Sequence, residues 1–156
     1  MTEAVEKKLD QQVSKRSPVS ITNFAVSDVN SIKPQESQKD FKQSFSQEVA
    51  EFLELKGMSY TMWDENNEII SILGVVPVCD VGVAWAVHSD LFHKYSIEIT
   101  KTIRRFFDDL SREGKFKKFI TSVTDEVVGG DRWAKFLKFT PTERHPLGFM
   151  QYERLV

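Results

Sequence analysis

The stretch IISILGVVPVCDVGVAWAV, residues 69–87, decides the class of protein to which the chain belongs. It is 19 residues long and nearly all apolar, which is about the length of one membrane-spanning helix. A spanning helix is disfavoured because Asp80 lies near the centre, where a carboxylate costs roughly 3 kcal/mol, and because Pro77 would break the helix. Val and Ile dominate the stretch, and both favour strands. We therefore predict two buried strands around a turn, and no membrane span.

The flanking residues extend these two strands into an antiparallel meander. Met58–Trp63 is predicted to form the preceding strand, and the polar residues Asp64–Asn67 form a turn into Ile69–Val76. A second turn, near Pro77–Gly82, leads into Val83–Val87. Three consecutive strands joined by short turns are typical of a meander.

Two amphipathic helices flank the meander. The first is predicted to begin at a capping box of Ser37 and Asp40 and to end at Gly57, a residue suited to a left-handed helix end. The second begins at Ser89 or Ser96. Their apolar faces, which we expect to lie in the core, carry Phe41, Phe45, Val49, Phe52 and Leu53 in the first helix and Ile99, Ile103, Phe106, Phe107 and Leu110 in the second.

The C-terminal residues complete a fold of the α/β class. Phe116–Thr124 alternates as a strand, and the helix before it makes a strand-helix-strand crossover, so this strand is parallel to Val83–Val87. The predicted architecture is a mixed sheet with an antiparallel meander and one parallel crossover. The remaining predicted elements are a first strand at Val19–Val26, a short helix opening at Gly129–Asp131 with Trp133, Phe136 and Leu137 facing inward, and two last strands at Thr140–Arg144 and Phe149–Leu155.

Composition excludes several classes of function. The 156 residues include 21 Lys and Arg against 23 Asp and Glu, which gives a net charge of −2 and a pI near 5.9, so a general nucleic-acid binder is not expected. The single cysteine, Cys79, excludes an intramolecular disulfide and a multi-cysteine zinc site. Met1–Gln12 contains three acidic residues and no apolar run, so we predict no signal peptide and an intracellular protein.

Residues 1–17 are predicted to form a flexible N-terminal arm ahead of a single domain, residues 18–156. Val5, Leu9 and Val13 recur four residues apart, which gives a thin apolar seam but too little surface for a core. Two interpretations stay open: a tail that is disordered in isolation, and an arm that becomes ordered when it docks to a partner protein.

Polar side chains gather between the last strand of the meander and the helix that follows. Cysteine, histidine and aspartate are metal-ligand types; Cys79 is nearby in the sequence, and His88, Asp90 and His93 occur here. They lie on a predicted loop with no fixed face, so we expect no metal site and predict that these groups cap the helix and satisfy the strand ends. If the chain were an enzyme, His88 or Asp90 would be its general base.

The order of the predicted elements resembles that of the GNAT acyltransferase superfamily. That order is strand, helix, three-strand meander, helix, strand, helix, strand, strand, and it extends from Val19 to Val156. The segment WAKFLKF, Trp133–Phe139, is similar to the family's helix that ends in Tyr-x-x-Leu-Gly-Phe. The resemblance implies a GNAT-like mixed sheet and, for an active member, acyl transfer from coenzyme A to an amine.

The chain differs from the family in the loop that binds coenzyme A and at the position of the general acid. In the family, glycines in the loop after the fourth strand let backbone amides close on the pyrophosphate of coenzyme A. The corresponding loop, HSDLFHKYS at residues 88–96, has no glycine. The tyrosine that protonates the departing thiolate corresponds to Ala134, and the family's glycine to Lys138. We therefore expect no cofactor; acetyl-CoA, if used, would lie against Phe92, His93, Lys94, Tyr95 and Ser96.

Within the superfamily, the chain resembles the internal virion and assembly proteins of short-tailed bacteriophages. The resemblance rests on GVVPV at Gly74–Val78, on Trp85 and Ala86 in the next strand, and on Trp133–Phe139. It implies a non-catalytic protein of the virion or host cytoplasm that contacts other virion proteins through its arm. Two alternatives stay open: an acyl-CoA-dependent N-acetyltransferase with an atypical CoA loop, and a small regulator that binds and inhibits a host protein.

Overall fold

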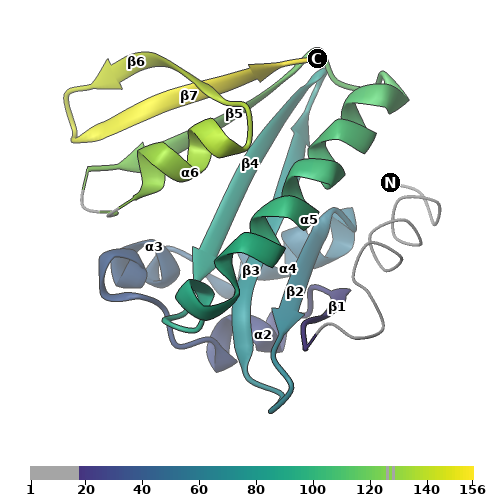
Figure 1. The fold of residues 1–156 in the computed structure, drawn as a ribbon, viewed down its shortest axis with the longest axis vertical. Coiled ribbons are helices and arrows are strands. Elements are labelled where there is room, and N and C mark those ends of the chain that lie inside the picture. The colour runs from purple at the N-terminus through teal and green to yellow at the C-terminus, as the bar shows by residue number, and fades with distance from the viewer. Residues whose placement is uncertain (1–17, 126, 128) are drawn as a thin grey trace. The chain divides into compact units, whose positions relative to one another are not determined.

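The chain folds as a mixed α/β sheet with helices packed on it (Figure 1). The strands are β1 (Ser20–Asn23), β2 (Ser59–Trp63), β3 (Ile69–Val78), β4 (Val81–His88), β5 (Lys118–Thr124), β6 (Thr140–His145) and β7 (Phe149–Leu155). The helices are α2 (Val26–Ser31), the 3-10 turn η1 (Glu36–Gln38), α3 (Lys39–Gln43), α4 (Gln47–Lys56), α5 (Phe92–Glu113) and α6 (Gly130–Phe136). The strand order is β1-β2-β3-β4-β5-β7-β6, which is mostly antiparallel and confirms the predicted fold class.

The computed structural model describes residues 18–125, 127 and 129–156, and the predicted arm at residues 1–17 lies outside the described residues. The chain divides into two compact units. The first runs up to Gly74 and includes Ala86–Ser96, and the second comprises Val75–Trp85 and Ile97–Val156. The single domain at residues 18–156 stays a prediction.

The first unit is built on an antiparallel ladder of β1, β2 and the first half of β3. Ser20 of β1 lies opposite Trp63, and Ser59 of β2 lies opposite Gly74. The ladder confirms the first two strands of the predicted meander. The largest fully buried side chains that it contributes are Tyr60, Met62, Ile70 and Ile72.

The first strand is shorter than predicted. It ends at Asn23, and α2 begins three residues later, because the buried carboxylate of Asp28 turns the chain. That carboxylate accepts the backbone N–H of Ala25 at 2.9 Å and the hydroxyl of Thr61 at 2.6 Å. An acidic side chain that caps its own helix and is held by a neighbouring strand outweighs the strand propensity of the preceding residues.

The helix predicted from Ser37 to Gly57 is two helices, α3 and α4. They are separate because Ser46 takes an extended conformation and its hydroxyl accepts the backbone N–H of Val49 at 3.2 Å, which makes Ser46 the N-cap of α4. Gly57 ends α4 in the left-handed conformation, with a φ of 68°, as its position predicted.

The break exposes part of the apolar face that we expected to lie in the core. The expectation holds for Leu53, which is buried, and is wrong for Phe41, Val49 and Phe52, which are 42%, 42% and 44% exposed. Residues four apart share a face only along one continuous helix axis. Because the axis changes at Ser46, the pattern no longer places these side chains together against the sheet.

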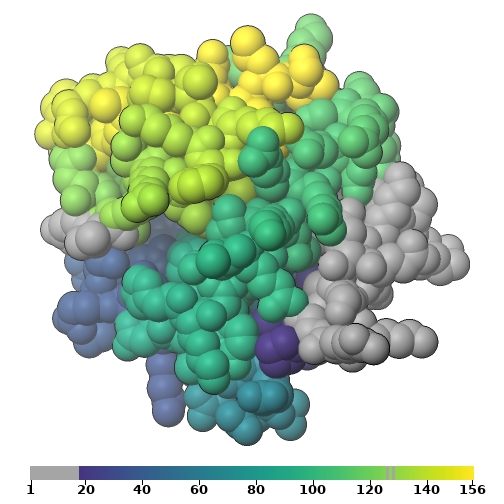
Figure 2. Space-filling model, viewed as in Figure 1, coloured from purple at the N-terminus to yellow at the C-terminus, as the bar shows by residue number. Residues whose placement is uncertain are grey.

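The second unit contains the one parallel pair of the sheet. Val81 of β4 lies opposite Lys118 of β5, and Gly82 lies opposite Phe119. The hydroxyl of Thr121 then donates to the carbonyl of Ala84 at 2.9 Å. This pair, with α5 between its strands in the chain, confirms the predicted crossover. Strands β5, β7 and β6 continue the unit as an antiparallel ladder, and α6, β6 and β7 form one continuous yellow-green to yellow surface (Figure 2).

Phenylalanines from α5, β5 and the residues after α6 form the core of the second unit. The ring of Phe107 meets Phe119 and Phe139 edge-on, with ring centroids 5.1 Å and 5.4 Å apart. Phe106 is also buried, which confirms the core face predicted for this helix. The inward position predicted for Phe136 is wrong, because this ring is 54% exposed at the end of α6.

The stretch that decides the class is two strands, as predicted, with a tighter turn than expected. β3 runs through Pro77, and the turn consists of Cys79 and Asp80 alone. The backbone N–H of Lys117 donates to the Asp80 carbonyl at 2.7 Å and ties this turn to the start of β5. Among the described residues, no helix is long and apolar enough to cross a membrane.

Candidate functional site

His88, the last residue of β4, lies in the first unit at the base of the loop that the resemblance associates with coenzyme A. Its imidazole is buried under the ring of Phe92, with ring centroids 4.0 Å apart and planes inclined by 25°. Its Nδ1 is hydrogen bonded to Ser71 Oγ at 2.7 Å, and its backbone N–H donates to Gln38 Oε1 at 2.7 Å. His88 is therefore enclosed and hydrogen bonded by the residues that support the loop.

Burial, with a smaller contribution from the neighbouring His93, lowers the pKa of His88 to about 3. The imidazole is therefore neutral at physiological pH. A general base works best when its pKa lies near the working pH. His88 thus has the low basicity and the enclosure of a structural residue, whereas Asp90, the other candidate base, is exposed.

We expect the free energy of unfolding to fall as the pH is lowered from 6.5 toward 3, by up to about 1.4 kcal/mol per pH unit from His88. In this window the unfolded chain protonates the imidazole and the folded chain does not, so acid favours unfolding. Urea unfolding of the natural chain and of His88→Gln, at matched pH values, measures the effect. Stability curves that stay parallel for the two proteins would contradict it.

The loop after His88 uses its own backbone donors. The N–H of Leu91 donates to Ser89 Oγ at 3.3 Å, and the N–H of Phe92 donates to the Ser89 carbonyl at 3.1 Å. The N–H of Lys94 donates to the Leu91 carbonyl at 3.1 Å. Ser89 is in turn fixed to β3, because its N–H and its hydroxyl both donate to the carbonyl of Ile70, at 2.9 Å and 3.1 Å.

Two glutamines near η1 hold the same loop. The backbone N–H of Gln35 donates to the His88 carbonyl at 2.8 Å, and its side-chain amide donates to the Ser89 carbonyl at 3.3 Å. The side-chain amide of Gln38 donates to the backbone of β4 at 3.1 Å. Sequence reasoning missed both glutamines and Ser71. Ser71 carried a signal, as a polar residue inside an apolar strand, and the glutamines carried none.

The structure separates the other residues predicted to meet a cofactor. His93 and Lys94 are exposed on the first turn of α5, while Tyr95 is buried and Ser96 is half-buried. His93 Nε2 lies 3.4 Å from Gln35 Nε2, and the Lys94 ammonium lies over the Tyr95 ring, 5.2 Å from its centroid. Phe92 packs on His88.

No group of three or more His, Cys, Asp or Glu side chains among the described residues could hold a metal ion. Cys79 precedes the first residue of β4 and His88 is its last residue, so the strand places the two at opposite ends. These residue types therefore occur close together in the sequence without converging in the fold.

The helix that resembles the family motif lies in the second unit as α6. Ala134, at the position of the family's tyrosine, is buried and carries no proton to donate. Lys138, at the position of the family's glycine, has a φ of 67°, the left-handed conformation that favours glycine. The match of WAKFLKF to the motif is thus a match of backbone conformation, without the acid.

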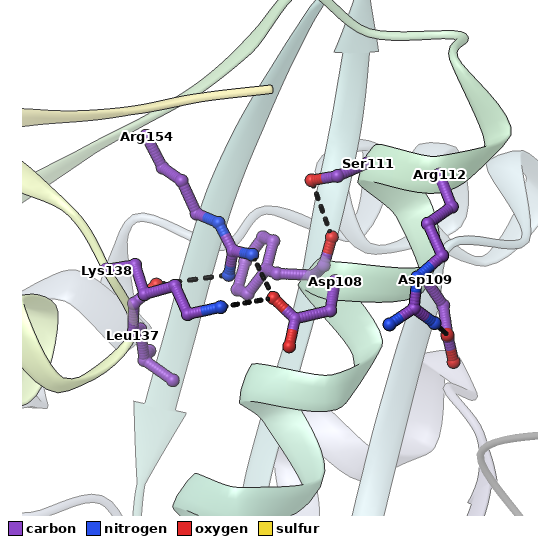
Figure 3. Close-up of polar contacts among 8 residues, drawn as sticks. Asp108, Asp109, Ser111, Arg112, Leu137, Lys138 and Arg154 are labelled. Atoms are coloured by element: carbon purple, nitrogen blue, oxygen red, sulfur yellow. Dashed lines mark hydrogen bonds and ion pairs between the residues drawn. The ribbon is translucent and has the colours of Figure 1, made fainter.

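A cluster of charges fixes the end of this motif to α5 and β7 (Figure 3). The buried guanidinium of Arg154 donates to the Leu137 carbonyl at 3.1 Å and to the carboxylate of Asp108, which also accepts Lys138 Nζ at 2.9 Å. Partial burial pulls the pKa of Asp108 upward, but the hydrogen bonds from Lys138 and Arg154 outweigh it and hold this pKa below its usual value.

Lys138→Gly is expected to be about 1 kcal/mol more stable than Lys138→Ala, because both changes remove the ion pair to Asp108 but only glycine relieves the left-handed backbone. The half-exposed ion pair contributes roughly 0.2–1 kcal/mol, so Lys138→Gly should stay close to the natural chain. Urea unfolding measures both differences. Equal stability of the two variants would show that the backbone at this position is unstrained.

The loop after β4 does not fit the pyrophosphate of coenzyme A in the way that the resemblance implies. Pyrophosphate is bound at a helix N-terminus by backbone N–H groups that point at the phosphate oxygens. Here the N–H groups of Leu91, Phe92 and Lys94 already donate to oxygens inside the loop. The loop has no glycine, and the aromatic ring of Phe92 stacks on His88 within it.

No protein-family model matches the sequence, and no curated protein sequence matches it. Solved structures do match the fold. An acetyltransferase of the GNAT family from Bacillus anthracis has a TM-score of 0.62 at 12% sequence identity, over 90% of this chain and 96% of that chain. Ard1 from Thermoplasma volcanium has a TM-score of 0.69 at 13% identity, over 89% of this chain and 98% of that chain.

One similar structure contains the cofactor. RimL, a ribosomal L7/L12 α-N-protein acetyltransferase in complex with coenzyme A, has a TM-score of 0.63 at 16% identity, over 92% of this chain and 97% of that chain. This complex contradicts our expectation that the chain uses no cofactor. The similar structures are acetyltransferases, and they match this chain over nearly their whole length. This also contradicts the expected non-catalytic virion assembly protein.

The comparisons give no support to the bacteriophage resemblance, to a location in the virion or to a particular partner protein. What they establish at 12–16% identity is architecture rather than activity. The meander, the parallel β4–β5 pair and the motif helix α6 together give this chain the fold of the GNAT acetyltransferases.

Proposed function

We propose that the chain is an N-acyltransferase that takes its acyl group from a thioester of the coenzyme A type and uses an atypical loop after β4. The observation that supports this proposal is the extent of the fold similarity, which covers about nine-tenths of the chain and of each acetyltransferase. A similarity confined to one motif would not support it. The parallel β4–β5 pair, which sets β4 apart from an ordinary meander strand, is part of that similarity.

The proposed acceptor is a primary amine, and the first class to test is the α-amino group of a protein or peptide. RimL, which has the same fold, acts on the α-amino group of a ribosomal protein. In such a transfer the amine nitrogen bonds to the acyl carbon, the carbon–sulfur bond breaks, and the proton lost by the amine balances the one gained by the thiolate. The transfer needs no oxidant or reductant.

The general base in this proposal is Asp90. Asp90 is exposed at the start of the loop, whereas His88 is buried with a pKa of about 3. Asp90→Asn should therefore lower kcat. His88→Gln should lower the free energy of unfolding and leave kcat nearly unchanged. In this proposal the proton for the thiolate comes from solvent.

Thermal unfolding with acetyl-CoA tests the proposal. A ligand that binds only the folded chain adds roughly 2.7 kcal/mol at 100 times its dissociation constant, which raises the melting temperature by about 5–10 °C in a chain of this size. Free adenosine at the same concentration is the control. No shift at millimolar acetyl-CoA, together with no shift for any other acyl thioester, would overturn the proposed function.

A further inference from the structure

We infer that the chain recognises its donor by the acyl-pantetheine end and not by the nucleotide, so that its substrate class is the S-acyl thioesters of 4′-phosphopantetheine, with or without the adenosine 3′,5′-bisphosphate part of coenzyme A. This inference rests on the proposed function and narrows it. It follows from the loop after β4, whose backbone N–H groups donate to oxygens inside the loop instead of being free to bind a pyrophosphate.

The backbone N–H donors of the loop are already used in hydrogen bonds within it. Binding a pyrophosphate requires N–H groups that are directed at it. The donors of Leu91, Phe92 and Lys94 are directed at oxygens of Ser89 and Leu91 inside the loop. A phosphate could reach these donors only after the hydrogen bonds of the loop were broken, and breaking them offsets what the new contacts contribute.

The loop is also held in this conformation from two sides. On one side, Ser89 donates twice to the carbonyl of Ile70 in β3. On the other, Gln35 and Gln38 bind the carbonyl and the N–H of His88. Because these supports are buried or half-buried, the loop cannot open toward a ligand without exposing polar groups that have lost their partners.

The charges at the loop also disfavour a pyrophosphate. Asp90 is an exposed carboxylate within the loop, and Glu36 is an exposed carboxylate that pairs with Lys39. The pKa of Lys39 is raised mainly by the hydrogen bond to Glu36, with a smaller contribution from Asp90, which places both acidic groups within electrostatic reach of this amine. The nearest loop cation, Lys94, lies over the Tyr95 ring. A pyrophosphate at this loop would be repelled by the carboxylates of Asp90 and Glu36, and Lys39 already pairs with Glu36.

Calorimetric titration of the full chain compares three donors that share the acyl-pantetheine group: acetyl-CoA, S-acetyl-4′-phosphopantetheine and S-acetyl-pantetheine. The inference expects their dissociation constants to agree within threefold. An acyl carrier protein charged with an acetyl group is the fourth arm, and tighter binding of this protein than of acetyl-CoA would support the inference and identify the carrier protein as the source. Binding of acetyl-CoA at least tenfold tighter than S-acetyl-pantetheine would overturn the inference and leave the proposed function standing.

Two further measurements separate the possible failures. Adenosine 3′,5′-bisphosphate at millimolar concentration should not displace S-acetyl-pantetheine, and displacement would overturn the inference. Lys94→Gln, with Lys101→Gln on the same helix as the matched control, should change the affinity for acetyl-CoA and for S-acetyl-pantetheine by the same factor; a selective loss for acetyl-CoA would show a phosphate contact and overturn the inference. If none of the donors binds, the proposed function fails, and the inference fails with it.

Discussion

Phe119→Ala lowers the free energy of unfolding by about 4 kcal/mol and the melting temperature by about 10 °C, because it empties the centre of the second unit. The side chain is fully buried, and its ring packs against Phe107 and Phe116 with centroids 5.1 Å and 5.3 Å away. The loss combines the transfer of the ring to water with the cavity that the neighbouring rings cannot fill. Urea unfolding followed by circular dichroism measures it.

Gly82 provides a test of the parallel register behind this prediction. A Cβ built on Gly82 would lie 2.6 Å from Phe119 Cδ1 and 2.8 Å from Val75 Cγ1, so Gly82→Ala should cost about 2 kcal/mol in the natural chain. In the Phe119→Ala background the ring is gone and only the close approach to Val75 Cγ1 remains, so the same change should cost less. Additive effects of the two substitutions would contradict the pairing of Gly82 with Phe119.

Arg154→Met lowers the free energy of unfolding by about 3 kcal/mol, because it removes a buried cation that serves three groups. The guanidinium binds the Leu137 carbonyl and the Asp108 carboxylate, and it lies over the Phe107 ring, 5.6 Å from the centroid. Methionine keeps most of the aliphatic packing, so the loss reports the polar contacts. Figure 3 shows how this one side chain connects β7, the end of α6 and α5.

Arg112→Met is the matched control for this substitution. Arg112 lies on the same helix as Asp108 and pairs with Asp109 at 2.8 Å, but its side chain is 75% exposed. The Asp109 carboxylate is itself buried, with 9% of its side chain exposed, so the control should cost about 1 kcal/mol, which is still well below the cost of Arg154→Met. If the two variants lost equal stability, burial would not be what makes Arg154 important.

The strands and the crossover were predictable because their signals are local. Stretches rich in Val and Ile, punctuated by Gly or by polar turns, predicted β3 and β4, and the long helical periodicity predicted α5. The break between α3 and α4 was not predictable from periodicity, since the apolar spacing passes through Ser46 unchanged. Serine there has to be recognised as an N-cap, which is a choice between two helix starts that the spacing leaves equal.

The position of the loop after β4 could be predicted from the sequence, and its hydrogen bonding could not. The absence of glycine at residues 88–96 marked the loop as atypical, but the sequence does not show where backbone donors point. The burial of His88 depends on Ser71 and Gln38, which are 17 and 50 residues away along the chain. Long-range contacts of this kind carry no periodic signal, and they convert a candidate base into a structural residue.

Transfer of an acetyl group to an amine is the direct test of the proposed function. The full chain is incubated with acetyl-CoA and peptides that carry a free α-amino group, and the acetylated peptide and the released thiol are measured in the same sample. The account predicts that both form in equal amounts, faster than in a sample with heat-denatured protein. Thiol and acetyl-peptide that form no faster than in the denatured control, for acetyl-CoA and for S-acetyl-pantetheine alike, would contradict it.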